Sequence, residues 1–185
     1  QQGLAVGERS YEHATCEDIG SVAKRSPQVN FPIYHSGYVT DTAEGPYDVK
    51  RSDGIDALVT SLIKNGIAPG SNVYAELGST WRLLMRDPDS ATHALGKLFK
   101  YCGQKNVLWG TDSIWYGSPQ DQIQAFRTFQ ISPVFRDKFG YPEMTKALRA
   151  DVFALNALKL YPVPAEVLKK NLGGDKVALA RDALR

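Results

Sequence analysis

The feature that most constrains this chain is an alternation of three short strand-like runs with helical patterns. The runs are 29–34, 72–77 and 106–109, and each is rich in β-branched, aromatic and other apolar residues. Apolar residues at helical spacing fill 53–64 and 89–102 between them. Strands that alternate with helices in this way lie parallel in one sheet and are joined by right-handed crossovers. The sequence therefore predicts an α/β fold.

Further helical patterns precede and follow these units, and no linker or low-complexity segment divides the chain. The additional helices are expected over 17–25, 119–129, 145–160, 164–171 and 175–184. We therefore expect a single domain over residues 1–185. The turn that begins at His35 after the first strand lacks the glycine spacing of a dinucleotide site. The pattern alone leaves two architectures, a small open α/β sheet and part of a larger barrel.

The composition excludes several classes of partner. The 22 basic and 20 acidic residues give a net charge of +2, and the basic residues are scattered, so neither nucleic acid nor an anionic membrane is expected. No stretch approaches the roughly 18 apolar residues of a membrane span. Cys16 and Cys102 form no CxxC pair, which excludes a zinc ribbon and favours buried, unpaired thiols. Reduced thiols favour the cytoplasm slightly.

Each of the three predicted strands ends in a histidine or a carboxylate. His35 follows the first strand, Glu76 closes the second and Asp112 follows the third. In parallel α/β folds the reactive groups gather at these carboxyl ends, and such side chains bind divalent metals and move protons. Each residue also has a structural explanation: a loop hydrogen bond for His35, a turn cap for Asp112 and a backbone contact for Glu76. Together the three favour a functional site.

Small and aromatic residues flank these candidates and suit the wall of a pocket. They are Ser36, Gly37, Ser79, Thr80, Ser113, Trp115 and Tyr116. The two other histidines are weaker candidates. His93 falls inside a helical pattern, and His13 precedes the first helix, from where it could reach the site. The chain has no GxSxG elbow, no P-loop and no HExxH motif.

The strand segments resemble those of one enzyme family over nearly the whole chain. Residues 29–38 are similar to its sixth strand, 72–78 to its seventh and 107–113 to its eighth, and 155–161 resembles a later helix. The family is the amidohydrolase-related group of metal-dependent TIM-barrel enzymes, which includes hydrolases and aminocarboxymuconate-semialdehyde decarboxylase. The resemblance implies the C-terminal portion of a (β/α)8 barrel, with its last three strands and the helices that follow.

The resemblance also implies a metal centre. Asp112 corresponds to the family's eighth-strand aspartate, a metal ligand that also takes a proton from metal-bound water. His35 corresponds to the sixth-strand histidine, which binds a metal or polarises the water or the substrate. Zinc is the expected cation, with manganese as the alternative, and Glu76 would support these two residues without touching the metal. Gln1-Gln2 stands where the family has a His-Lys pair, so this chain alone offers too few ligands to close the site.

The implied function is hydrolysis of C–N or C–O bonds in a small molecule by metal-activated water. His35 and Asp112 would serve both as catalytic residues and as metal ligands. Non-oxidative decarboxylation on the same scaffold is one alternative, and an inactive or purely binding relative is another. As a fragment, the chain would pair with a complementing N-terminal half or with a second copy in a homo-oligomer.

Overall fold

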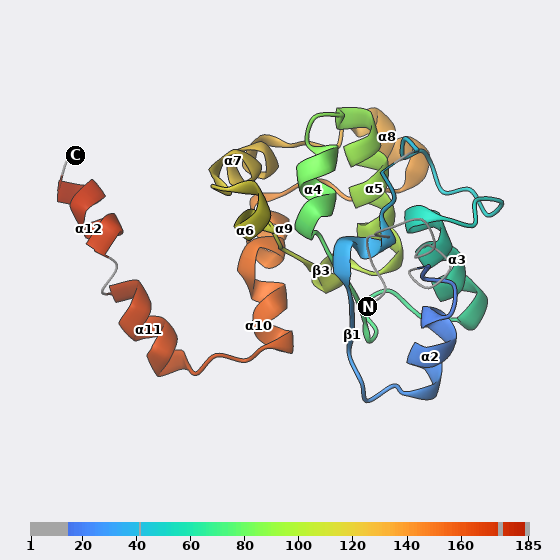
Figure 1. Cartoon of the computed structure of the whole chain (residues 1–185), viewed down its shortest axis with the longest axis horizontal. Coiled ribbons are helices and arrows are strands. Elements are labelled where there is room, and N and C mark those ends of the chain that lie inside the picture. The colour runs from blue at the N-terminus through green and yellow to red at the C-terminus, as the bar shows by residue number, and fades with distance from the viewer. Residues whose placement is uncertain (1–14, 41, 174–175, 184–185) are drawn as a thin grey trace.

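A computed structural model of the chain describes residues 15–40, 42–173 and 176–183, and it consists of a small sheet surrounded by helices (Figure 1). The strands are β1 (Phe31–Ile33), β2 (Val73–Glu76) and β3 (Val107–Leu108). They form one sheet in the order β1-β2-β3, and both pairs run parallel. The three strand predictions are confirmed, although each strand is shorter than the apolar run that indicated it.

The expectation of a barrel portion is wrong, because the sheet is open and helical residues cover the outer edge of β3. The backbone N–H of Trp109 donates to the carbonyl of Val152 (3.1 Å), and Asn156 Nδ2 donates to the carbonyl of Val107 (2.9 Å). Val152 and Asn156 are helical, so groups that a further strand would use are already satisfied. The described residues form the other architecture that the pattern left open, a small open α/β sheet.

Helices connect and cover the strands. Those before β3 are α2 (Ile19–Arg25), the 3-10 turn η1 (Tyr34–Gly37), α3 (Gly54–Asn65), α4 (Gly78–Leu84), α5 (Pro88–Tyr101) and the 3-10 turn η2 (Gln104–Asn106). Those after β3 are α6 (Ser113–Tyr116), α7 (Gln120–Thr128), α8 (Pro133–Phe139), α9 (Lys146–Ala150), the π-helical turn η3 (Asp151–Leu155), α10 (Asn156–Leu160), α11 (Ala165–Gly173) and α12 (Lys176–Ala183). Every region predicted as helical contains a helix. The short helices α4, α6 and α8 were not predicted.

Local sequence signals explain where the two longest helices between strands begin and end. Helix α3 ends at Gly66, a residue in the left-handed region (φ 69°), where glycine carries no Cβ penalty. Helix α5 follows Asp87, whose side chain accepts a hydrogen bond from the N–H of Ser90. Pro88 occupies the first position of α5, where its missing N–H costs nothing.

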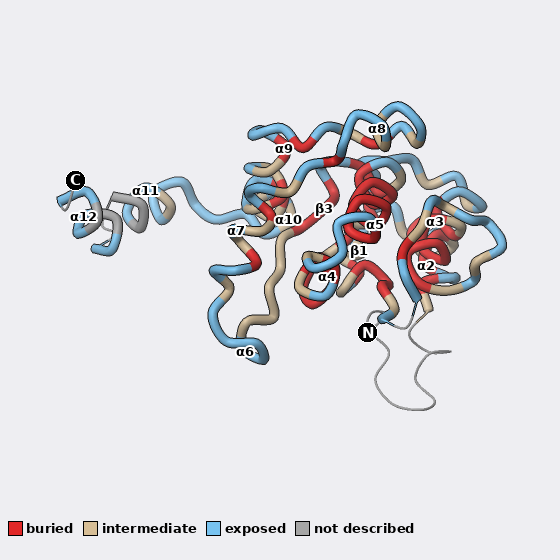
Figure 2. The backbone as a smooth tube through the Cα atoms, turned by 90° about the horizontal axis from the view of Figure 1, so that it is seen from above, coloured by how far each residue is buried: buried red, intermediate tan, exposed pale blue. Residues whose placement is uncertain are grey.

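The core lies between the sheet and helices α3, α4 and α5, which are red along their inner faces in Figure 2. Trp81 on α4 is buried, packs edge-to-face on Phe126 (ring centroids 5.1 Å apart) and donates its indole N–H to the carbonyl of Gln122 (2.9 Å). Burying such a side chain contributes about 1.5–3 kcal/mol. This packing fixes α4, the helix whose first turn reaches the carboxyl edge of the sheet.

Buried asparagines fix the opposite edge of the sheet. Asn72, which precedes β2, donates to the carbonyl of Val29 (2.9 Å), and Asn106, which precedes β3, donates to that of Val73 (2.8 Å). Asn72 thus bonds the residues just before β1, and Asn106 bonds the first residue of β2, so both amides help to set the register of the strands at their beginnings. Their carboxyl ends therefore meet along a common edge.

The last two helices have few contacts with the rest of the described chain. Figure 1 shows α11 and α12 extending away from the sheet and its covering helices. Figure 2 shows that the described residues of this extension are largely exposed. In the part of the chain that the structure describes, no helix is both long and apolar enough to span a lipid bilayer.

Candidate functional site

The three strand-end candidates come together at the carboxyl edge of the sheet. His35 lies in η1 directly after β1, Glu76 is the last residue of β2, and Asp112 lies between β3 and α6. His35 Nδ1 is 3.6 Å from Asp112 Oδ2 and 3.8 Å from Glu76 Oε2. All three side chains are mostly buried but keep some exposure, between 15% and 28%. The placement expected from the strand-end rule is therefore observed.

Ser79, in the first turn of α4, holds His35 and Asp112 in place. Its backbone N–H lies 3.0 Å from Asp112 Oδ2 and 3.2 Å from His35 Nδ1, so both atoms accept from it. Its hydroxyl bonds the same Asp112 oxygen (2.6 Å) and lies 2.9 Å from the hydroxyl of Tyr116. Ser79 and Tyr116 were expected only as pocket walls, and their role as hydrogen-bonding supports had no signal in the sequence.

Glu76 supports the site by accepting hydrogen bonds from two backbone N–H groups. Its Oε2 accepts from the N–H of His35 (3.1 Å) and its Oε1 accepts from the N–H of Gly78 (2.7 Å). Burial raises the pKa of the Glu76 carboxyl, and these two hydrogen bonds partly oppose that rise. Gly110 leaves room for the carboxylate, since a Cβ there would lie 1.6 Å from Oε1.

Backbone strain is concentrated at this edge. Among the described residues, only three other than glycine have positive φ: His35 (57°), Ser36 (55°) and Asp112 (49°). Each such residue costs about 1–2 kcal/mol. Hydrogen bonds hold the strained turn, because Ser36 Oγ donates to the carbonyl of Glu76 (2.8 Å) and Thr80 Oγ1 donates to that of His35 (2.6 Å). Strain held by surrounding contacts is typical of functional sites.

The contacts of His35 fix which ring nitrogen carries the proton. The N–H of Ser79 donates to Nδ1, so neutral His35 has its proton on Nε2. In the hydrogen bonds among the described residues, His35 Nε2 and Asp112 Oδ1 take no part. The site therefore offers a substrate one N–H donor and one carboxylate oxygen.

The described residues do not fit the metal centre that the resemblance implies. In residues 15–40, 42–173 and 176–183, no group of three His, Cys, Asp or Glu side chains is placed to hold a cation. The N–H of Ser79 donates to both His35 Nδ1 and Asp112 Oδ2, so these two atoms are already engaged and do not face an empty position for a shared cation. Backbone N–H groups bond both oxygens of Glu76. We therefore derive no chemical step through a metal.

Apolar side chains project beside the site from α6, the turn that follows Asp112. Ile114 is 87% exposed and Trp115 is 80% exposed, which is unusual for residues of this size. The next residue, Tyr116, stacks under the guanidinium of Arg82 (4.4 Å to the ring centroid). An apolar surface beside a polar donor and a carboxylate suits a substrate with an apolar group.

The remaining sequence candidates lie apart from this edge or outside the described residues. His93 is buried in α5, where Nδ1 lies 3.1 Å from the hydroxyl of Tyr141. Cys16 and Cys102 are buried and unpaired, as predicted. His13 and the Gln1-Gln2 pair fall outside the described part of the chain.

Comparison with known proteins assigns neither a family nor a function. No protein-family model, no curated protein sequence and no solved structure matches the chain. The amidohydrolase resemblance therefore rests on the segments 29–38, 72–78, 107–113 and 155–161 alone. The function has to be argued from the geometry of the site.

Proposed function

We propose that the edge formed by His35, Glu76 and Asp112 is the active site of a hydrolase that cleaves a C–N or C–O bond in a small molecule. The observation that carries the proposal is the convergence of His35 and Asp112 on Ser79, with strained backbone at both residues. The strand-end position of these side chains supports a catalytic role, and the resemblance to amidohydrolases supports hydrolysis as the type of reaction.

His35 Nε2 and Asp112 Oδ1, which make no hydrogen bond within the described residues, would have different roles in hydrolysis. Asp112 Oδ1 takes a proton from the attacking water, and the resulting hydroxide adds to the carbonyl carbon. His35 Nε2–H donates a hydrogen bond to the carbonyl oxygen, where negative charge develops as the water adds. A neutral imidazole can serve in this way as an electrophile. The proton on Asp112 then passes to the leaving nitrogen or oxygen as its bond to carbon breaks.

Supporting residues keep these atoms in position rather than meet the substrate. Ser79 holds Asp112 Oδ2 and His35 Nδ1, which leaves the opposite atom of each group free to act. Glu76 fixes the backbone of His35. The exposed apolar side chains of Ile114 and Trp115 would contact an apolar or aromatic part of the substrate, so aryl esters and anilides are the first substrates to test.

The deciding experiment measures hydrolysis of a panel of chromogenic aryl esters, anilides and lactones by the purified chain. Asp112→Asn is expected to lower kcat/KM at least about 100-fold, because it removes the general base. Asp137→Asn, an exposed carboxylate on α8, is the matched control and should leave kcat/KM unchanged. If Asp112→Asn hydrolyses every substrate as fast as the unaltered chain, the proposal fails.

Elemental analysis on the same samples tests the metal that the resemblance implies. If the purified chain holds about one zinc or manganese ion, and Asp112→Asn holds none, then Asp112 binds a metal and the mechanism has to include it. Activity that survives treatment with a chelator would leave catalysis to His35 and Asp112 alone. Either outcome is compatible with hydrolysis, so metal content and activity are measured separately.

A further inference from the structure

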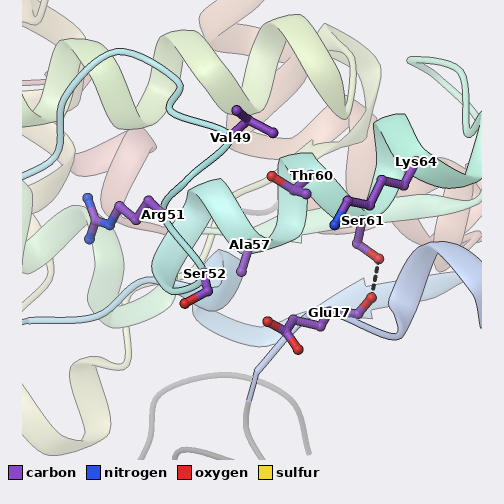
Figure 3. Close-up of a pocket in the computed structure, with 8 residues that line it drawn as sticks. All are labelled: Glu17, Val49, Arg51, Ser52, Ala57, Thr60, Ser61 and Lys64. Carbon is purple, nitrogen blue, oxygen red and sulfur yellow. Dashed lines mark hydrogen bonds between the residues drawn. The ribbon is translucent and has the colours of Figure 1, made fainter.

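A hollow lined by polar and charged side chains lies beside α3, and it shares no residue with the proposed active site. Its volume is about 290 Å³. Figure 3 shows its lining, which comes from the turn before α2, the loop before α3 and one face of α3. The lining residues are Glu17, Val49, Arg51, Ser52, Ala57, Thr60, Ser61 and Lys64. The volume is just below the range of pockets that hold drug-sized ligands, so it suits a smaller molecule.

Two opposite charges face this hollow without an ion-pair partner. The side chains of Glu17 and Lys64 both line it and are both exposed. In the described part of the chain, neither makes an ion pair, either with the other or with a third residue. Figure 3 shows Glu17 and Lys64 on different elements, the turn before α2 and helix α3. A ligand could therefore meet one negative and one positive group at once.

Several other polar groups of the lining already have partners within the protein. Ser61 Oγ donates to the carbonyl of Glu17 (2.6 Å) and accepts from the N–H of Gly20 (3.0 Å). Thr60 Oγ1 lies 3.1 Å from the hydroxyl of Tyr47. Arg51, the third charged residue of the lining, pairs with Asp53. Because these groups are engaged, recognition in the hollow would depend mainly on the charges of Glu17 and Lys64.

We propose that this hollow binds a small zwitterion, an α-amino acid with an aliphatic side chain. Its carboxylate would bind Lys64 and its ammonium group would bind Glu17, so both charges of the ligand are matched. Its side chain would contact Val49 and Ala57, the apolar residues of the lining. The inference does not depend on the proposed hydrolase, because no residue of the hollow belongs to that site.

The test compares three related molecules by NMR titration of the whole chain. L-valine carries both charges, N-acetyl-L-valine lacks the ammonium group, and L-valinamide lacks the carboxylate. The unaltered chain should bind L-valine about 1.4- to fivefold more tightly than either analogue, since an exposed ion pair is worth about 0.2–1 kcal/mol. The amides of Gly20 and Ser61 should shift as L-valine binds.

Two charge-neutralising variants assign each end of the ligand separately. Glu17→Gln should remove the preference for L-valine over the N-acetyl analogue and leave the preference over the amide. Lys64→Gln should do the reverse, and Lys24→Gln, an exposed lysine outside the hollow, should change neither preference. The proposal is overturned if L-valine does not bind saturably, or if all three molecules bind with equal affinity. Asp112→Asn should still bind L-valine, which separates this result from the proposed function.

Discussion

Replacing Lys97 with methionine should destabilise the fold more than any change at an exposed lysine. The Lys97 side chain is fully buried in α5, with Nζ 2.5 Å from Glu44 Oε2 and 2.9 Å from Asp56 Oδ1. Both carboxylates are also buried, and Arg51 approaches each of them no closer than 3.8 Å. Lys97→Met therefore leaves two buried carboxylates without their close partner. Breaking such a pair costs about 3–5 kcal/mol.

This cost is a large share of the 5–15 kcal/mol that stabilises a typical domain. For a chain of this length it corresponds to a fall in Tm of about 6–20 °C. Urea unfolding followed by tryptophan fluorescence, to which buried Trp81 contributes, would measure it, with circular dichroism as a second probe. Lys24→Met, the same substitution at an exposed helical position, should change the free energy of unfolding by less than about 0.5 kcal/mol.

A rescue variant separates lost charge pairing from lost packing. Adding Glu44→Gln and Asp56→Asn to Lys97→Met removes the unpaired charges and should recover part of the lost stability. No recovery would mean that the methionine side chain simply packs badly. Our reasoning is refuted if Lys97→Met alone unfolds within about 0.5 kcal/mol of the unaltered chain.

Two further predictions concern titratable groups in the core. Burial, and secondarily the nearby Lys97 charge, lower the pKa of His93, so its neutral form favours folding. The unaltered chain should therefore lose stability relative to His93→Gln as pH falls below about 6.5, measured by urea unfolding at several pH values; parallel curves would contradict this. Burial raises the pKa of the Cys16 and Cys102 thiols to about 12, so neither should react with a thiol reagent at pH 8 until urea unfolds the chain. Rapid modification of the folded chain would argue against buried thiols.

The elements and the place of the candidate site could be predicted because both depend on local sequence. Apolar spacing indicated the strands and the longer helices, and strand ends alone selected His35, Glu76 and Asp112. Parallel pairing brings the carboxyl ends of neighbouring strands together, so residues far apart in the chain meet without any long-range information. That rule places His35, Glu76 and Asp112 at one edge of the sheet, where His35 Nδ1 lies 3.6 Å from Asp112 Oδ2 and 3.8 Å from Glu76 Oε2.

The architecture could not be chosen in the same way, because a barrel portion and an open sheet share the same strand–helix units. What distinguishes them is the partner of the outer edge of β3. Here that partner is helical, with Asn156 bonding the carbonyl of Val107 across 49 residues. Nothing in the residues near Val107 indicates this contact, and resemblance to a barrel family pointed the other way.

Supporting residues were missed because their roles depend on such distant contacts. Ser79 meets Asp112 across 33 residues, and helix α4, which carries it, has too little periodicity to be recognised. Lys97 lies in an amphipathic helix, where a lysine is normally exposed. It is buried only because Glu44 and Asp56 reach it from the preceding loop and from α3.

The buried charges and the strained site are linked through the chain itself. The loop that leaves the strained residues His35 and Ser36 reaches Glu44, where Lys97 fixes it to α5. Three left-handed residues at about 1–2 kcal/mol each cost about 3–6 kcal/mol, which is comparable to a domain's whole stability. Such strain persists only where surrounding contacts hold it, and the Lys97 network supplies one of those contacts. Lys97 is therefore expected to help keep the site in its strained geometry, although it touches neither His35 nor Asp112.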